Sequence, residues 1–121
     1  MFYKFTDFNK LRGKGTCFFE IQYCDLSEKK LFNINKIKHY SKDSLYVVDI
    51  DNFGKLYDDV LGYGVYPNLK EGYFDDSGIT YFSSERVEVI KKKLFEKKPD
   101  GYDTFLEWLD NCHNGFYILG I

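Results

Sequence analysis

The feature that most constrains the fold is the nearly unbroken apolar run at residues 115–121, Gly-Phe-Tyr-Ile-Leu-Gly-Ile. Chain termini normally fray unless contacts with the rest of the fold hold them in place. An apolar end without a polar tail therefore predicts a strand that is buried within a sheet. The turn-forming pair Asn114-Gly115 marks the entry into this strand.

Two helices and another strand are predicted before this terminal strand. Residues 78–82 form a short β-prone run. Ser83 or Ser84 can cap a helix that Pro99 ends, and Asp100 can cap the helix after it. The apolar positions repeat at helical spacing and are Val87, Ile90 and Leu94 in the first helix and Tyr102, Phe105, Leu106 and Leu109 in the second. Residues 78–121 therefore predict a strand–helix–helix–strand module.

The first half of the chain is richer in strand signals. Residues 16–25 alternate as in a strand, and the apolar residues 45–50 predict a central strand. Residues 31–38 are compatible with either a strand or a helical turn. We favour the strand, because it completes a hairpin with residues 16–25. Three consecutive strands with short connections then predict an antiparallel meander.

A third helix is predicted over residues 52–61. Its apolar residues lie at helical spacing and are Phe53, Leu56, Tyr57, Val60 and Leu61. Asp51 or Asn52 would cap this helix, and Gly62 would end it in a left-handed conformation. Residues 62–78 follow as a loop-rich connection, and a connection of this length usually has a function or short strands of its own.

These elements predict one α+β domain over residues 1–121, an antiparallel β-sheet with about three helices packed mainly on one face. No run approaches the roughly 18 apolar residues of a membrane span, and the N-terminus lacks the apolar segment of a secretion signal. We therefore expect a cytoplasmic protein with no membrane partner. Three cysteines without CxxC spacing and two histidines give no zinc signature, and no cofactor is expected.

Catalytic motifs are not evident. Asp49 and Asp51 could share one side of a strand end and bind Mg²⁺ or Ca²⁺, but apolar residues stand where an EF-hand needs oxygen ligands. One solvated aspartate and one helix cap explain the pair. Cys112 and His113 are adjacent, so on a helix they would point about 100° apart and could not easily pair as nucleophile and base. We expect no enzymatic activity and no small-molecule substrate, with a small uncharacterised enzyme as an alternative.

A nucleic-acid-binding module is a second alternative. Residues 1–42 carry nine basic residues against four acids, and aromatic residues in this third could stack on bases. These aromatic residues are Phe2, Tyr3, Phe5, Phe8, Phe18 and Phe19, and the basic residues nearest to them are Lys10, Arg12 and Lys14. The stretch lacks the aromatic and glycine pattern of sheet-based RNA binders, and the net charge of the chain is −2. Nucleic acid is therefore the less favoured partner.

The middle of the chain is acidic and rich in tyrosine. Residues 43–76 carry eight acids against two lysines. Rigid aromatic rings anchor interfaces at low entropic cost, and carboxylates steer and orient a basic partner. The residues expected to bind a partner are Tyr57, Asp58, Asp59, Tyr63, Tyr66, Tyr73, Asp75 and Asp76. In the alternative interpretation Tyr57 belongs to the core, the loop tyrosines cover the sheet edge and the acids keep the surface soluble.

The run Gly78-Ile79-Thr80-Tyr81-Phe82-Ser83, the two helices after it and the terminal residues 114–121 resemble the small bacterial immunity proteins of polymorphic and contact-dependent growth inhibition toxin systems. The resemblance covers about the last 45 residues. It implies a cytosolic, non-enzymatic protein that binds the C-terminal domain of one cognate toxin, often a nuclease, and occludes its active site. No binding residue is carried over by motif.

Overall fold

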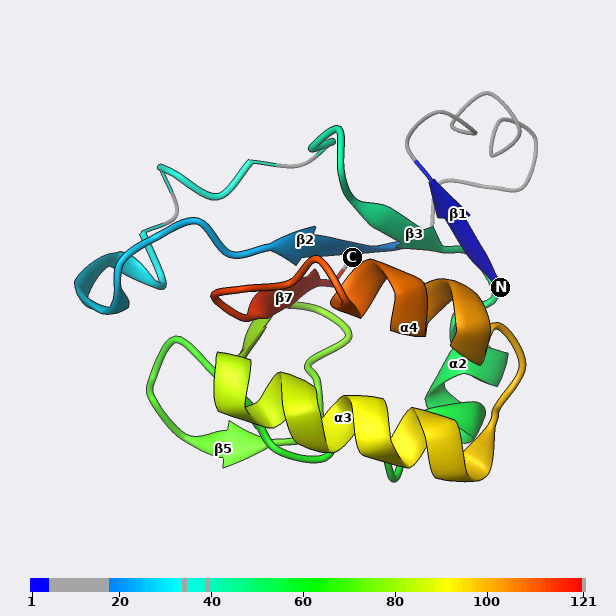
Figure 1. Cartoon of the computed structure of the whole chain (residues 1–121). Helices are drawn as coiled ribbons and strands as arrows, with labels where there is room; N and C mark the ends of the chain where they lie inside the picture. Colours follow the sequence, from blue (N-terminus) through cyan, green and yellow to red (C-terminus); the bar gives the residue numbers. More distant parts are fainter. Residues whose placement is uncertain (5–17, 34, 39, 121) are drawn as a thin grey trace.

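The computed structural model describes residues 1–4, 18–33, 35–38 and 40–120, which form one seven-stranded sheet and three α-helices (Figure 1). All paired strands are antiparallel, in the order β1-β3-β2-β7-β6-β4-β5. The strands are β1 (Phe2–Lys4), β2 (Phe19–Tyr23), β3 (Leu45–Val47), β4 (Gly64–Val65), β5 (Glu71–Gly72), β6 (Ile79–Phe82) and β7 (Phe116–Leu119). The helices are α2 (Ile50–Leu56), α3 (Ser84–Lys97) and α4 (Tyr102–Leu109), with a short 3₁₀ helix η2 (Glu28–Lys30). The predicted α+β class is confirmed.

The terminal strand β7 lies at the centre of the sheet. Ile118 stands opposite Ile21 of β2 and Thr80 of β6, and all four residues of β7 are buried. Both faces of the sheet are covered here, so the strand needs apolar side chains on both faces. This requirement explains the unbroken apolar run. Gly115 enters the strand with a φ of 84°, a left-handed conformation that favours glycine.

The strand–helix–helix–strand module is also confirmed. Strands β6 and β7 pair directly, and α3 and α4, which connect them, pack against each other. The Ser83 hydroxyl caps α3 by accepting a hydrogen bond from the main-chain nitrogen of Arg86 at 3.2 Å. The predicted Asp100 cap of α4 is wrong. Gly101, with a φ of 80°, holds the cap position, because the chain leaves α3 through a left-handed turn that a glycine tolerates.

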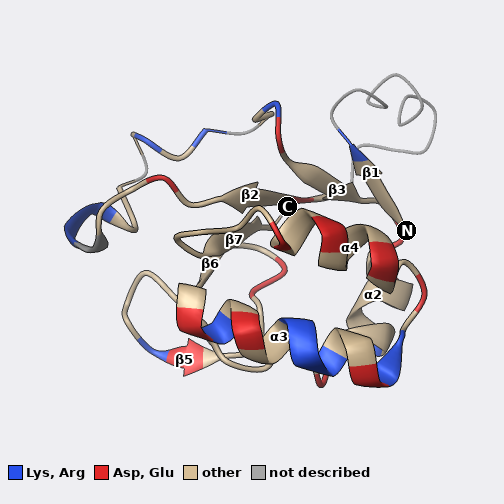
Figure 2. Cartoon of the chain, viewed as in Figure 1, with Lys and Arg blue, Asp and Glu red and all other residues tan. Residues whose placement is uncertain are grey.

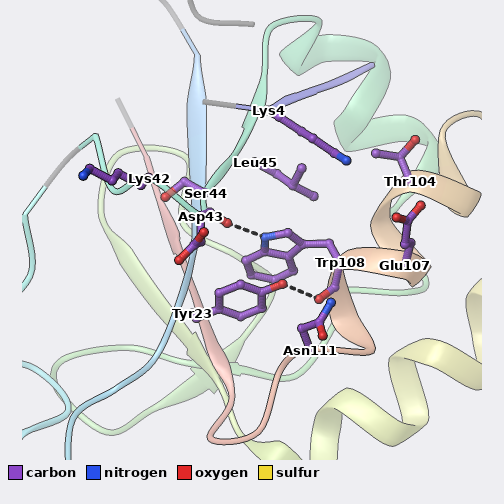
Figure 3. Close-up of a pocket in the computed structure, with 10 residues that line it drawn as sticks. All are labelled: Lys4, Tyr23, Lys42, Asp43, Ser44, Leu45, Thr104, Glu107, Trp108 and Asn111. Carbon is purple, nitrogen blue, oxygen red and sulfur yellow. Dashed lines mark hydrogen bonds between the residues drawn. The ribbon is translucent and has the colours of Figure 1, made fainter. Parts of the chain in front are cut away.

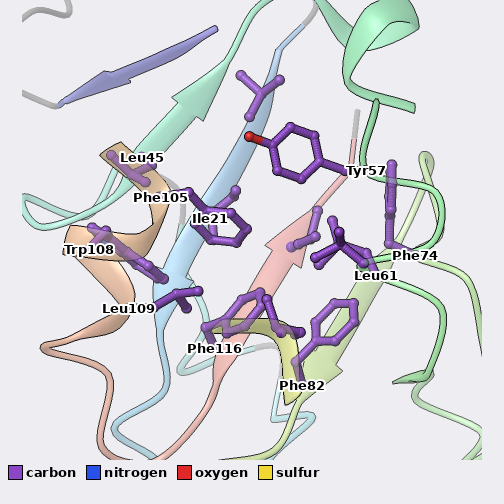
Figure 4. Packing of buried hydrophobic residues seen from close by; sticks show 14 of the residues in the cluster. Ile21, Leu45, Tyr57, Leu61, Phe74, Phe82, Phe105, Trp108, Leu109 and Phe116 are labelled. Atoms are coloured by element: carbon purple, nitrogen blue, oxygen red, sulfur yellow. The ribbon is translucent and has the colours of Figure 1, made fainter. Parts of the chain in front are cut away.

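The main core lies between the helices and one face of the sheet (Figure 4). Phe53 of α2, Ile90 of α3 and Phe105 of α4 are fully buried in this core. Sheet residues that contribute to it are Phe19, Ile21, Leu45, Val47, Phe82, Phe116 and Ile118. The opposite face is covered by a smaller cluster that includes Tyr117 and Leu119. The three helices therefore share one face, as predicted.

The segment between β2 and β3 corrects the sequence analysis. The described part of residues 31–38 contains turns and no strand, so the predicted hairpin and three-stranded meander are wrong. Instead β3 pairs with β1 on one side and β2 on the other. Leu31 and Ile37 pack against the second cluster, and the Tyr117 hydroxyl donates a hydrogen bond to the Leu31 carbonyl. These apolar residues cover the rear of the sheet from a loop rather than extending the sheet.

Helix α2 begins two residues earlier and ends five residues earlier than predicted. Asp49 is the N-cap, and its carboxylate accepts a hydrogen bond from the Asn52 nitrogen at 3.4 Å. Turns continue after Leu56, and Gly62 does not adopt the predicted left-handed conformation. The earlier start has a consequence for the surface, because it leaves Asp51 exposed in the first turn rather than occupied as a cap.

Candidate functional site: an acidic groove lined by tyrosines

A groove of about 620 Å³ lies beside the first turns of α2. We call it the acidic groove. It is formed by the start of β2, by α2 and by the loop that joins β5 to β6, with one tyrosine from the turn after β4. Its lining residues are Phe19, Ile50, Asp51, Gly54, Tyr66, Tyr73, Phe74, Asp75 and Asp76. Aromatic rings and three carboxylates therefore share one concave surface.

Hydrogen bonds and ring packing hold the tyrosines of the groove in place. The Tyr66 hydroxyl donates to the Tyr73 carbonyl, and the Tyr73 hydroxyl donates to the Gly54 carbonyl of α2 at 3.1 Å. Phe74 anchors the same loop in the core, with its ring centroid 5.4 Å from that of Phe19. Both tyrosine hydroxyls are thus used internally, and the two side chains have little freedom left to lose on binding.

Hydrogen bonds hold the loop that carries the Asp75 carboxylate in place. The main-chain nitrogen of Asp75 donates to the Thr80 hydroxyl at 2.8 Å, and the Asp75 carboxylate accepts from the Ser77 nitrogen at 3.0 Å. Asp51 and Asp76 are exposed like Asp75. Among the described residues, no lysine or arginine forms an ion pair with any of these three aspartates. The groove therefore carries three negative charges that have no basic partner in the described part of the chain.

Burial raises the pKa of Tyr73 from its ordinary value of 10.0 to about 12, and the negative charge of Asp58 adds to the increase. The phenol therefore stays protonated at neutral pH and keeps its hydrogen bond to Gly54. The charge of Asp58, an exposed residue of the turn after α2, therefore acts on a tyrosine that lines the groove.

Four of the eight residues predicted to bind a partner come together in the groove: Tyr66, Tyr73, Asp75 and Asp76. Asp58 is a neighbour of this set. Asp59 points elsewhere. Its carboxylate forms an ion pair with Lys97 of α3, and this lysine lowers the pKa of Asp59. Lysines and glutamates are interspersed along α3 (Figure 2). The Nζ of Lys93 also donates to the Asp59 carbonyl at 2.9 Å. Asp59 is therefore already neutralised within the chain.

Tyr63 is 59% exposed and lies outside the groove. The guanidinium carbon of Arg86 lies 4.4 Å from the centroid of its ring, a cation–π contact. The Nε and Nη2 atoms of Arg86 are buried and have no hydrogen-bond partner among the described residues. The ring of Tyr63 therefore provides part of the stabilisation that hydrogen bonds to these two nitrogens would otherwise give.

Tyr57 is the one predicted contact residue that the structure contradicts. Its side chain is fully buried, its ring stacks on Phe53 with 4.9 Å between centroids, and its hydroxyl donates to the Asp100 carbonyl at 2.8 Å. Tyr57 lies on the apolar side of the segment after α2, and its hydroxyl finds a partner inside the fold. The interpretation of Tyr57 as a core residue is the correct one.

Sequence reasoning missed Asp51 and Gly54 as parts of this site. The sequence predicts Asp51 or Asn52 as the N-cap, and this is wrong because Asp49 caps α2. The interpretation of Asp49 and Asp51 as one helix cap and one solvated aspartate is correct, with Asp51 the solvated one. The available signal was the pair of acids two residues apart, since only one of them can occupy the cap. Gly54 gave no signal, because its contribution is a backbone carbonyl that accepts from Tyr73.

A second hollow, of about 590 Å³, lies between α4 and the β3 end of the sheet (Figure 3). Tyr23 and Trp108 stack there with 3.9 Å between ring centroids. The Tyr23 hydroxyl donates to the Trp108 carbonyl, and the indole nitrogen donates to the Asp43 carbonyl, both at 2.6 Å. The other charged residues of its lining carry both signs: Lys4, Lys42 and Glu107. This aromatic pair joins β2, the turn before β3 and α4, and its polar atoms are occupied internally.

Of the residues weighed for catalysis, Cys112 shows no activation. Burial raises the pKa of Cys112 to about 11, so its thiol is protonated at neutral pH, whereas a nucleophilic cysteine needs a lowered pKa. Cys17 and His39 lie outside the described residues. Within the described ranges, no three His, Cys, Asp or Glu side chains gather closely enough to hold a metal ion.

The aromatic residues proposed to stack on nucleic-acid bases lie in different environments. Phe19 is buried, and Phe2 packs against the core with its ring centroid 5.2 Å from that of Phe105. Phe18 contacts the rings of Tyr40 and Tyr46. The remaining candidates in this alternative, Phe5, Phe8, Lys10, Arg12 and Lys14, lie outside the described residues.

Comparisons with protein-family models, with curated proteins and with solved structures gave no match to this chain. In the part of the chain that the structure describes, no helix has the length and apolar character needed to cross a membrane. A function for this chain is therefore inferred from its own geometry and charge.

Proposed function

We propose that this chain is an immunity protein, which binds the C-terminal domain of a cognate toxin in the cytoplasm and inhibits it stoichiometrically. The observation that carries the proposal is the acidic groove, where two immobilised tyrosines meet three carboxylates that have no basic partner among the described residues. The inhibitor would act by occlusion. Its groove and the adjacent Asp58 would cover basic residues that the toxin needs for its substrate.

The chemistry of the groove suits a basic protein partner. A nuclease holds the phosphates of its substrate with lysine and arginine side chains, and the same side chains attract a surface rich in carboxylates. Opposite charge on the two surfaces accelerates association and fixes the orientation of the complex. The tyrosines add contact area with little loss of side-chain entropy. A nuclease toxin is therefore the partner that this surface favours.

The test starts from the reading frame immediately upstream of the gene for this chain. Its C-terminal domain is expressed in a bacterial host with and without this chain, and growth is measured. We expect growth to stop without the chain and to recover with it, and we expect a one-to-one complex on size-exclusion chromatography. An upstream product that is harmless, or that still kills in the presence of this chain, would contradict the proposed function.

Matched variants test whether the acidic groove is the surface that binds the toxin. Asp51, Asp75 and Asp76 are changed together to asparagine, which preserves side-chain size and removes three negative charges. This variant should lose protection, whereas Asp59→Asn should retain it, because Asp59 is already paired with Lys97. Thermal unfolding of both variants shows whether they fold. Full protection by the triple variant would exclude the acidic groove as the binding surface.

A further inference from the structure

We infer that the acidic groove receives an arginine side chain of the partner, with the guanidinium between the carboxylates and the tyrosine rings. This inference rests on the proposed function for its biological setting, and the chemistry of the groove carries the choice of side chain. The groove has three features that together favour a planar cation: acids without a basic partner among the described residues, tyrosine side chains in its lining and an open, concave volume of about 620 Å³.

The charge of the groove requires a cation. Asp51, Asp75 and Asp76 line the groove. The negative charge of Asp58, which acts on Tyr73, adds to theirs. An anionic or neutral ligand would leave these carboxylates uncompensated while displacing the water that now solvates them, which is unfavourable. A cationic ligand instead replaces that water with charge-assisted hydrogen bonds.

The aromatic walls distinguish arginine from lysine. The hydroxyls of Tyr66 and Tyr73 are used in internal hydrogen bonds, so these residues offer ring surface rather than polar atoms. A guanidinium is planar, weakly hydrated and able to stack on an aromatic ring while its nitrogens bond carboxylates in pairs. An ammonium is more strongly hydrated and bonds as a compact point charge. The combination of tyrosine rings and three carboxylates in one lining therefore favours the guanidinium.

The size of the groove is suitable for a side chain together with part of its main chain. Ligand sites in proteins enclose about 300–1,000 Å³, and the groove lies within this range. Its walls are formed before the partner arrives, because Phe74 is buried in the core and Tyr73 is tied to α2. A partner arginine would therefore enter a preformed site, as anchor residues of protein interfaces commonly do.

The experiment is an NMR titration of the ¹⁵N-labelled full chain with N-acetyl-arginine-methylamide. The neutral control is the corresponding citrulline compound, which has nearly the same shape and no charge. The third ligand is the lysine compound. We expect the arginine compound to shift the amide signals of Asp51, Gly54, Tyr66 and Asp75, to bind more tightly than the lysine compound and to exceed the citrulline compound by at least about fivefold in affinity.

Two variants complete the test. Replacing Asp75 and Asp76 together by asparagine should weaken arginine binding by roughly two- to fivefold for each charge removed. Asp59→Asn should leave the affinity unchanged, because Asp59 is paired with Lys97 away from the groove. Equal binding of the citrulline compound, tighter binding of the lysine compound, shifts confined to other residues, or unchanged affinity in the double variant would each overturn the inference.

The two proposals fail separately. Arginine binding at the groove combined with no protection against the upstream toxin would contradict the immunity function and leave the guanidinium site supported. Protection that depends on the three aspartates without any arginine binding would contradict the guanidinium site and leave the immunity function supported.

Discussion

Replacing Gly72 by alanine should disturb the acidic groove through one identifiable contact. A side-chain carbon at position 72 would lie closer than 3.0 Å to the hydroxyl oxygen of Tyr66, a separation that real Cβ atoms essentially never show. The φ of Gly72 is not left-handed, so the backbone of β5 itself accepts an alanine. The Tyr66 hydroxyl must therefore move, and its hydrogen bond to the Tyr73 carbonyl is lost.

The expected change in the free energy of unfolding follows from the loss of this single hydrogen bond. Losing a hydrogen bond of this kind lowers the free energy of unfolding by about 0.5–1.5 kcal/mol. A Gly→Ala change at a compatible backbone position returns about 0.4–1 kcal/mol through the unfolded state. When Tyr66 is already phenylalanine there is no hydroxyl, and the nearest ring atom, Cζ, lies 3.1 Å from the added carbon, which a small ring shift relieves. Gly72→Ala should therefore be less destabilising in the Tyr66→Phe background, with a coupling energy of about 1 kcal/mol.

The assay is a double-mutant cycle measured by urea unfolding, followed by the fluorescence of Trp108, the single tryptophan of the chain. It is buried beside Phe105 and Phe116, so unfolding changes its environment. Gly62→Ala is the matched control, because an added carbon there meets no atom within 4 Å, and it should leave stability unchanged or slightly higher. Strict additivity of Gly72→Ala and Tyr66→Phe would refute the proposed contact.

Three further predictions concern buried and half-buried residues. Tyr57→Phe removes the hydrogen bond to the Asp100 carbonyl and should lower the free energy of unfolding, measured by urea unfolding, by about 0.5–1.5 kcal/mol. Protection against the toxin, measured by the growth assay, should not be reduced. Burial raises the pKa values of Tyr23 and Tyr73 from 10.0 to about 12, so the fold favours their protonated forms. Their contribution to stability should be complete below pH 10 and lost as the pH rises through 12, which urea midpoints across that range would show; constant midpoints would contradict it. Ile118→Ala, at a fully buried position of the central strand, should lower the free energy of unfolding by about 2–5 kcal/mol, and a loss below about 1 kcal/mol would contradict its central place in the core.

The elements that could be predicted from sequence are those whose signals are local. Helix α3 has a capping serine directly before its apolar repeat and a proline two residues after its end, so nearest neighbours specify both its limits. Strand β7 was recognisable because its unbroken apolar run satisfies both faces of a covered strand. In each case the residues that form the element also carry the information that specifies it.

The segments that were predicted wrongly depend on contacts with distant residues. The apolar side chains of Leu31 and Ile37 suited a strand, but the structure uses them to cover the rear of the sheet from a loop. Glu20 lies in β2 with 1% of its surface exposed. Its carboxylate accepts hydrogen bonds from the main-chain nitrogens of Tyr40 and Ser41 at 2.7 and 3.0 Å. These bonds fix the loop before β3, and sequence patterns do not report partners about 20 residues away.

The sequence by itself determined that residues 43–76, before the C-terminal module, combine eight acids and five tyrosines with only two lysines. Only the tertiary structure decided which of them remain available. It buried Tyr57 in the core, paired Asp59 with a lysine 38 residues away and joined Asp51 to Tyr66, Tyr73, Asp75 and Asp76. The physical reason is that charge compensation and burial depend on distance in space. Local sequence gives the composition of a surface, and the packing of α2 and α3 determines its charge.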